Sequence, residues 1–188
     1  MKENPYQEDR EQMQELLRQY DNLKTGRKNS FIEEDSFEKI INYFEEKDEL
    51  SKAIEAAEIA IEQYPFSSTL LIRKAHILLT VRRYKQALEI LDRASLFDGS
   101  DINLYILKTD AFLALDEPEK AVALLEEALI VFEGEERIEL LFELADVYDD
   151  YEEFEKVFDC LKVILEQDPN NEEALYKICF WTDFTGRN

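Results

Sequence analysis

Residues 50–65, with the sequence LSKAIEAAEIAIEQYP, decide the fold of this chain. Ala53, Ala57 and Ala60 fall on one side of a helix that turns once every 3.6 residues. Small side chains on one face let a second helix approach closely. The stretch closes at Pro65, which cannot continue a helix. These residues therefore predict one amphipathic helix that packs tightly against a neighbour.

The same pattern returns along the chain at intervals of 34 residues. The first small-residue place holds Ala53, Ala87 and Ala121, and the second holds Ala60, Ala94 and Ala128. The place between them holds Ala57, Leu91 and Leu125. After a slip of two residues, a fourth copy carries Val157, Leu161 and Ile164 at these places. Because the same period appears at three separate positions of the pattern, it predicts a repeated helix pair.

A second helix is expected before each of these segments. Its large apolar residues recur at spacings of three, four and seven, and they are Phe37, Ile40, Ile41 and Phe44, then Leu71, Ala75 and Leu78, then Tyr105 and Phe112, then Leu141, Leu144, Ala145 and Tyr148. A second apolar stripe on the same helices comprises Tyr43, Ile77, Ala111, Val147 and Trp181. Helices that are apolar on two sides are expected to dock on the preceding pair, as stacked repeats require.

Helix-breaking residues separate the expected helices. Tyr64-Pro65, Asp98-Gly99 and Asp168-Pro169 end the second helices, whereas Asp48, Arg82-Arg83 and Asp116-Glu117 mark tight turns inside the pairs. Pro118 suits the first position of a helix, where its missing N–H has no cost.

When the places of each 34-residue repeat are numbered from its first residue, small residues lie near places 20 and 27, and a Pro or Gly lies near place 32. In this pattern the chain resembles the tetratricopeptide repeat family. The resemblance covers residues 34–188. It implies an all-α fold, a right-handed α-solenoid of stacked antiparallel helix pairs. Place four, usually Trp or Leu in the family, holds Phe37, Leu71, Tyr105 and Leu141. Place eight, usually Gly, holds Ile41, Ala75, Thr109 and Ala145.

The expected organisation is an N-terminal helix followed by the array. Residues 1–33 form a capping helix and linker, with an apolar face of Met13, Leu16, Leu17, Tyr20 and Leu23 between Asn4-Pro5 and Gly26. The units of the array span 34–67, 68–101, 102–137, 138–171 and a partial 172–188. A free partner-binding arm is the alternative role for the first helix.

The composition restricts the class of partner. The net charge is −22, with 22 basic and 44 acidic residues. Such a chain is repelled by nucleic acid and anionic membranes, although the acidity can also serve solubility alone. No apolar signal core or membrane-spanning stretch is present in the sequence, so a cytoplasmic location is expected. Cys160 and Cys179 fall on apolar helix faces, and we expect both to be buried free thiols in a reducing compartment; a disulfide is the alternative.

Catalysis, metals and cofactors are not expected. The sequence lacks a phosphate loop, a GxGxxG and a GxSxG. The single histidine, His76, has no neighbouring nucleophile, and neither cysteine lies in a zinc-type CxxC. The acidic run from Asp146 to Glu155 lacks the loop spacing of an EF-hand. We therefore expect a non-enzyme.

The family resemblance implies that the first helices line a concave surface where a partner peptide or protein binds. The residues carried over to that groove are Lys39, Asn42, Thr69, Arg73, His76, Asn103, Leu107, Asp110, Phe142, Asp146 and Tyr176. Lys39, Asn42, Arg73 and Asn103 could begin a clamp for a carboxylate terminus, but the later units turn acidic and break that pattern. The alternative is that these residues are merely solvated.

Charge divides this expected groove. Residues 68–101 carry six basic and four acidic residues, whereas residues 138–171 carry two basic and eleven acidic residues. We expect a bound segment to place apolar and basic side chains near Phe142, Asp146 and Tyr176.

The last helix has an apolar side with no following helix to cover it. This side comprises Leu175, Ile178, Cys179 and Trp181. Either the chain is part of a longer repeat protein, or this face forms a homodimer or docks another domain. The leading function is a protein-interaction scaffold; a self-assembling structural module or a non-catalytic accessory domain is the alternative.

Overall fold

The computed structural model describes residues 5–26 and 31–185, which form helices and no strand. The chain divides into two compact units, residues 1–99 (unit 1) and residues 100–188 (unit 2). In unit 1 the helices are α1 (Pro5–Lys24), α2 (Glu34–Glu46), α3 (Leu50–Gln63), α4 (Ser68–Thr80) and α5 (Tyr84–Ser95). In unit 2 they are α6 (Ile102–Ala114), α7 (Pro118–Val131), α8 (Gly134–Asp150), α9 (Phe154–Gln167) and α10 (Glu172–Thr185). The predicted all-α class is confirmed.

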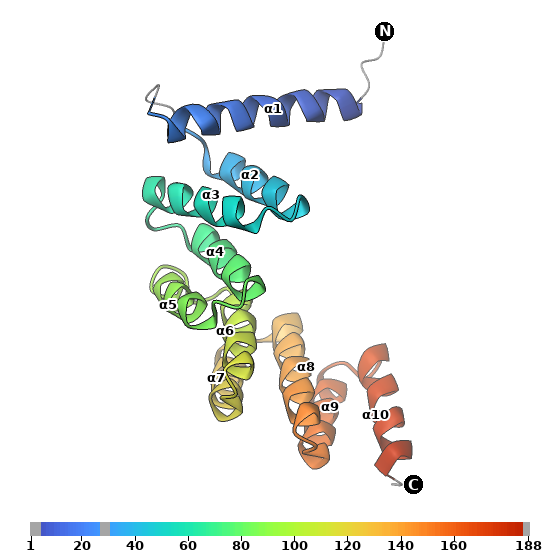
Figure 1. Cartoon of the computed structure of the whole chain (residues 1–188). Helices are drawn as coiled ribbons and strands as arrows, with labels where there is room; N and C mark the ends of the chain where they lie inside the picture. The colour runs from blue at the N-terminus through green and yellow to red at the C-terminus, as the bar shows by residue number, and fades with distance from the viewer. Residues whose placement is uncertain (1–4, 27–30, 186–188) are drawn as a thin grey trace. The chain divides into compact units, whose positions relative to one another are not determined.

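Within each unit, helices that follow one another along the chain pack together (Figure 1). The pairs α2–α3 and α4–α5 lie in unit 1, where α3 also packs on α4. The pairs α6–α7 and α8–α9 lie in unit 2, where α7 packs on α8 and α9 on α10. Inside a unit, each helix therefore covers apolar surface of its predecessor, which is how a repeat array builds its core.

The small residues that define the period lie inside this core. All six alanines at the two small places are fully buried, namely Ala53, Ala60, Ala87, Ala94, Ala121 and Ala128. The large residues predicted for the first helices are also buried, except that Tyr105 and Phe112 are half-buried. The second stripe is buried at Ile77, Ala111 and Val147 and half-buried at Tyr43 and Trp181. The sequence pattern thus identified the faces that pack.

Each helix pair turns through one residue with a left-handed backbone. The residues are Asp48, Arg82, Asp116 and Glu152, with φ between 57° and 60°. In the first turn, the N–H groups of Asp48 and Glu49 donate to the carbonyls of Glu45 and Phe44 at 2.9 and 2.8 Å. This is the Schellman arrangement, which satisfies carbonyls left over at a helix end. The same two bonds recur in the other three turns, so the repeat extends to its hydrogen bonds.

The two-residue slip before the fourth copy is taken up by a longer helix. Only Phe132 and Glu133 connect α7 to α8, and α8 has 17 residues where α6 has 13. Phe132 is buried and packs edge-on against the ring of Tyr105 at 5.3 Å between centroids. This contact packs the short connection against α6. The two inserted residues are therefore accommodated at the start of α8, which is longer.

Helix α1 lies on α2 and contacts α3. Tyr20 is buried, with its ring 6.0 Å from that of Phe44, and Lys24 Nζ lies 2.6 Å from Glu55 Oε2. The other apolar residues of α1 that the sequence singled out are half-buried. Gly26, with φ of 64°, follows the helix as expected. Asn4, which was expected at the start of this helix, and residues 27–30 of the expected linker lie outside the described residues.

The prediction that both cysteines are buried is wrong for Cys179. Cys160 is buried on α9, where burial raises the pKa of its thiol to about 11, while Cys179 is exposed on α10. Both are free thiols. Because one α10 face packs on α9, Ile178 and Trp181 are half-buried against the unit 2 core, and the flank with Leu175 and Cys179 stays open. Within residues 5–26 and 31–185, no helix has the length and apolarity needed to cross a bilayer.

Candidate partner-binding surface

In unit 1, two of the polar residues that were expected to bind a partner, Asn42 on α2 and Arg73 on α4, contact each other instead. The Arg73 guanidinium donates to Asn42 Oδ1 and forms an ion pair with Glu45 Oε2 at 2.6 Å. His76 Nδ1 lies 3.7 Å from the other oxygen of Glu45. The Glu45 side chain is only 17% exposed, whereas that of Arg73 is 34% exposed, so the ion pair lies at the edge of the protein interior.

This cluster reduces the donors left for a carboxylate clamp. A clamp needs several donors directed at one incoming carboxylate. Arg73 already contacts Glu45 and Asn42, and Lys39, Thr69 and His76 are the exposed donors on this side of unit 1. Asn103 lies in unit 2 and donates to Asp101 near the start of α6. The contacts therefore give no support to a clamp.

A repeated contact links neighbouring first helices. Arg73 meets Asn42 across 31 residues of sequence, and Lys177 meets Asp146 across the same separation, with Lys177 Nζ 2.6 Å from Asp146 Oδ1. In the numbering of the repeat, a basic side chain at place six contacts a hydrogen-bond acceptor at place nine of the preceding helix pair. The α2–α4 and α8–α10 interfaces thus share one kind of polar bond.

The corresponding place on α8 carries an acid. Glu143 occupies place six and faces Asp110, which occupies place nine of the preceding pair on α6. Burial raises the pKa of Glu143, and the charges of Asp110, Asp146 and Glu139 raise it further. Lys177 opposes this rise. Where the two other interfaces have a base, this one has like charges.

The acidic surface is the name we use for the side of α6, α8 and α10 around this point. It comprises Asp110, Glu139, Phe142, Glu143, Asp146, Asp149, Glu173, Tyr176, Lys177 and Phe180. Burial, followed by the charges of Asp146 and Asp150, raises the pKa of Asp149 as well. Lys177 contacts Asp146 and Glu173, at 2.6 and 3.6 Å. Lys177 thus pairs with two of these carboxylates.

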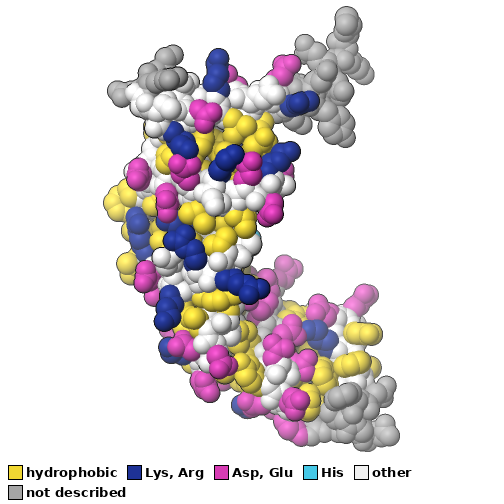
Figure 2. All heavy atoms as spheres, in the orientation of Figure 1, with side chains coloured by type: hydrophobic (Ala, Val, Ile, Leu, Met, Phe, Trp, Pro, Cys, Tyr) yellow, Lys and Arg dark blue, Asp and Glu magenta, His cyan; other side chains and the backbone are white. Residues whose placement is uncertain are grey.

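Aromatic rings lie among these carboxylates. Lys177 Nζ lies 5.4 Å from the centroid of the half-buried Phe142 ring. Tyr176 is 73% exposed and Phe180 is 52% exposed, and both extend from α10. Figure 2 shows acidic side chains gathered over unit 2, with hydrophobic side chains exposed between them. Acidic groups beside exposed rings form a surface suited to cations and apolar groups.

The predicted site residues therefore fall into two groups. Lys39, Asn42, Thr69, Arg73 and His76 lie on α2 and α4 in unit 1; Asn103, Leu107, Asp110, Phe142, Asp146 and Tyr176 lie on α6, α8 and α10 in unit 2. The spacing rules missed Glu45, which organises the first group. Its position three residues after Asn42, on the same side of α2, was the available signal.

No group of three or more His, Cys, Asp or Glu side chains suited to a metal ion is found in the part of the chain that the structure describes. The acidic surface therefore has many carboxylates but not a ligand cage.

Comparison with solved structures identifies the fold. The chain matches TTC0263, a thermophilic TPR protein in Thermus thermophilus, with a TM-score of 0.64 and 17% identity over 88% of each chain. It matches a tetratricopeptide repeat protein from Parabacteroides merdae with a TM-score of 0.65 and 20% identity, over 81% of this chain and 60% of that chain. It also matches YrrB, described as a TPR protein with an unusual peptide-binding site, with a TM-score of 0.56 and 17% identity, over 81% and 78%.

Comparisons by sequence add nothing to this result. No protein-family model matches the chain, and no curated protein does. At identities of 20% or less, the structural matches show the fold, and they confirm the stacked helix pairs that the 34-residue period predicts.

Proposed function

We propose that this chain, which has the fold of tetratricopeptide repeat proteins, is a non-catalytic protein-interaction module in the cytoplasm. Its acidic surface on α6, α8 and α10 binds an extended partner segment that carries Lys or Arg side chains next to apolar ones. The proposal retains the division of residues 34–188 into four helix pairs and a partial fifth, with residues 1–33 as cap and linker.

The observation that carries the proposal is the like-charge contact at Glu143. Glu143 is half-buried, and burial, followed by the charges of Asp110, Asp146 and Glu139, raises its pKa, so the charged carboxylate is in an unfavourable environment. A cation brought by a partner would lower that unfavourable energy. Because binding would remove an existing repulsion, the site favours a basic ligand over a neutral one.

Apolar contacts would fix the segment in place. The rings of Phe142, Tyr176 and Phe180 flank the acidic groups, and an Arg side chain can stack on such rings. Polar partners alone would leave these rings exposed to water. A segment with alternating basic and apolar residues meets both needs.

The test is a titration of basic-apolar peptides against the double variant Phe142→Ala with Asp146→Lys. We expect the affinity to fall at least about tenfold, equivalent to about 1.4 kcal/mol, since the variant loses a ring and reverses a charge. The matched control is Phe97→Ala with Glu166→Lys, which changes an exposed ring and an exposed acid elsewhere.

Binding should also weaken with salt, because exposed charges are screened beyond about 10 Å at 0.1 M ionic strength. Equal affinities for the double variant and the wild-type protein, with every peptide tried, would reject the acidic surface as the binding site.

A second candidate function is self-association through α10. Leu175, which is 42% exposed, and the exposed Cys179 lie on the flank of α10. Two copies that met there would cover this flank in an isologous dimer. Sedimentation under reducing conditions should then show a concentration-dependent mass that Leu175→Glu abolishes. A constant monomer mass would exclude this candidate.

A further inference from the structure

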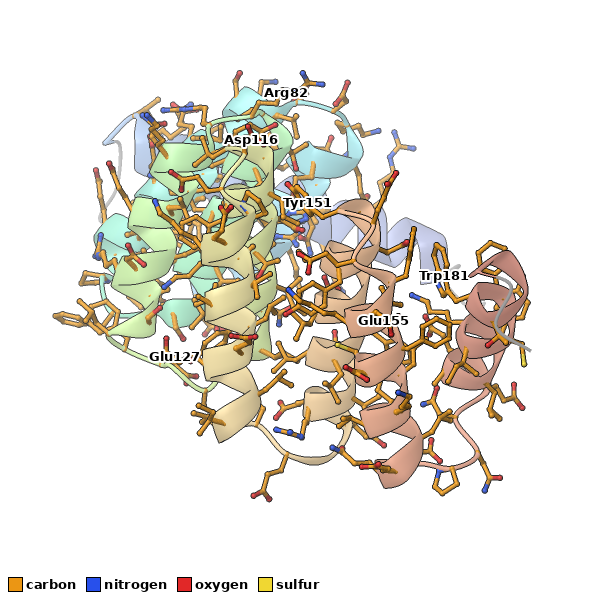
Figure 3. All side chains as sticks on the ribbon, turned by 90° about the horizontal axis from the view of Figure 1, so that it is seen from below. Arg82, Asp116, Glu127, Tyr151, Glu155 and Trp181 are labelled. Carbon is orange, nitrogen blue, oxygen red and sulfur yellow. The ribbon has the colours of Figure 1, made fainter. Side chains whose placement is uncertain are left out.

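A pocket of about 270 Å³ lies between α7, α8 and α9 in unit 2. Its lining residues come from the start of α7, the end of α8 and the start of α9, and are Pro118, Glu119, Val122, Ala123, Glu126, Val147, Tyr148, Tyr151, Glu153 and Lys156. In Figure 3, Tyr151 and Asp116, which precedes α7, lie toward the same end of these helices, while Glu127 lies further along α7. Small-molecule sites are typically about 300–1,000 Å³, so this volume suits one side chain.

The pocket is separate from the acidic surface. Phe142 and Asp146, which belong to that surface, are four residues apart and share one side of α8. At about 100° per residue, Val147 and Tyr151 point to the other side of the helix. A ligand in the pocket would therefore contact α7 and α9, whereas a ligand on the acidic surface would contact α6 and α10.

The walls and the rim of the pocket differ in chemistry. Val122, Ala123 and Val147 supply apolar wall, and Tyr148 and Tyr151 supply two rings. Tyr151 is 43% exposed, so part of its ring is available. Carboxylates stand around this wall. The combination suits a side chain with an aliphatic stem and a charged end.

Lys156 shows that the pocket accepts a cation. Its Nζ lies 4.7 Å from the centroid of the Tyr148 ring and pairs with Glu153. This is the geometry of a cation–π contact supported by a carboxylate. The chain thus uses its own lysine in one part of the pocket.

The carboxylates on α7 remain available to a ligand. Glu119 and Glu126 lie seven residues apart, on the same side of α7 as Val122 and Ala123. In the described part of the chain, no Lys, Arg or His lies within ion-pair distance of either. Glu126 accepts a hydrogen bond of 3.4 Å from the Tyr148 hydroxyl, and burial followed by Glu126 raises the pKa of that hydroxyl to about 12. The local potential is therefore negative.

We propose that this pocket binds a single arginine side chain of a partner protein, with its stem against Val122 and Ala123 and its guanidinium between Tyr151 and Glu126. Arginine fits better than lysine for two reasons. Its planar group stacks on an aromatic ring, and its forked donors match a carboxylate. Arginine binding in this pocket is independent of the function proposed for the acidic surface.

The probe is a pair of short peptides, Ac-Gly-Gly-Arg-Gly-Gly-NH2 and the same peptide with citrulline, which has the shape of arginine without its charge. Methyl NMR signals of Ala123 and Val147 report the pocket, and ring signals of Phe142 and Tyr176 report the acidic surface. We expect saturable shifts at Ala123 and Val147 with the arginine peptide and at least fivefold weaker binding of the citrulline peptide.

Two pairs of variants locate the site. Ala123→Trp fills the pocket from an exposed position, and Ala114→Trp is the matched control on α6. Glu126→Gln removes the rim charge, and Glu127→Gln removes the next charge along α7, which does not line the pocket. With the Val147 methyl as the common reporter, we expect the first member of each pair to weaken the pocket shifts at least threefold and the second to leave them unchanged.

Equal binding of the two peptides, or equal effects within either pair of variants, would overturn the proposal. Shifts confined to Phe142 and Tyr176 would also overturn it, while leaving the acidic surface intact as a site.

Discussion

Units 1 and 2 share a repeat and a core but differ in how their polar residues are matched. Residues 1–99 carry 15 basic and 20 acidic residues, whereas residues 100–188 carry 7 basic and 24 acidic residues. In unit 1, Arg73 forms an ion pair with Glu45 and donates a hydrogen bond to Asn42. In unit 2, Glu143 faces other acids at the equivalent position. A repeat can thus keep one core while its polar contacts change from attractive to repulsive.

The largest expected effect tests whether the two cores are equivalent. Leu91 on α5 and Leu125 on α7 occupy the same repeat position, and both are fully buried. Leu91→Ala and Leu125→Ala should each lower the free energy of unfolding by about 2–5 kcal/mol, because each leaves a cavity. Urea unfolding followed by circular dichroism measures this.

Leu96→Ala is the control, since Leu96 is 81% exposed and its loss should cost less than about 0.5 kcal/mol. A cost at Leu125 as small as that at Leu96 would mean that the unit 2 core is not packed as described.

The next effect tests the matched polar cluster of unit 1. Arg73→Ala should lower the free energy of unfolding by about 1–3 kcal/mol, because Glu45 is only 17% exposed and would lose its cation. Lys39→Ala, at an exposed position of the neighbouring helix, should change it by less than about 0.5 kcal/mol. Thermal unfolding of the two variants compares them directly. If both variants unfold at the wild-type temperature, Arg73 does not stabilise unit 1 through Glu45.

The smallest effect concerns the repulsion in unit 2. The pKa of Glu143 in the folded state lies above its ordinary value of 4.5. At a pH between 4.5 and the folded-state pKa, the folded protein therefore binds more protons than the unfolded chain. The contribution of Glu143 to stability therefore rises as the pH falls through its folded-state pKa toward 4.5. Glu143→Gln should remove that rise and stabilise the protein at pH 7, by less than about 1 kcal/mol after solvent screening.

Melting temperatures at pH 7 and pH 5 provide the measurement, with Glu166→Gln on the exposed side of α9 as the control. A wild-type pH dependence that survives in Glu143→Gln would assign the repulsion to other groups, of which Asp149 is the first to examine.

Much of the fold was predictable because helix geometry is local. The spacing of Ala53, Ala87 and Ala121 identified buried faces in both units, and the breakers at Pro65 and Pro169 marked helix ends. The candidate surface was predictable only in part. Positions within the repeat predicted that Phe142, Asp146 and Tyr176 lie on neighbouring first helices. They could not predict that Glu45 forms an ion pair with Arg73.

The burial of Cys179 was predicted wrongly for a related reason. An apolar face is buried only where another element covers it, and α9 covers the Trp181 side of α10 rather than the Cys179 side. The pocket of α7, α8 and α9 was not predicted at all. Its residues are distant in sequence, and no repeat position marks them as a group.

By itself, the sequence determined the helices, their period and the faces that pack, because a helix repeats every 3.6 residues whatever lies around it. Only the tertiary structure decided which charges meet, as between Lys177 and Asp146 or between Glu143 and Asp110. These contacts depend on the distance between helices and on the reach of long side chains. Neither quantity is recorded in the spacing of residues along a chain.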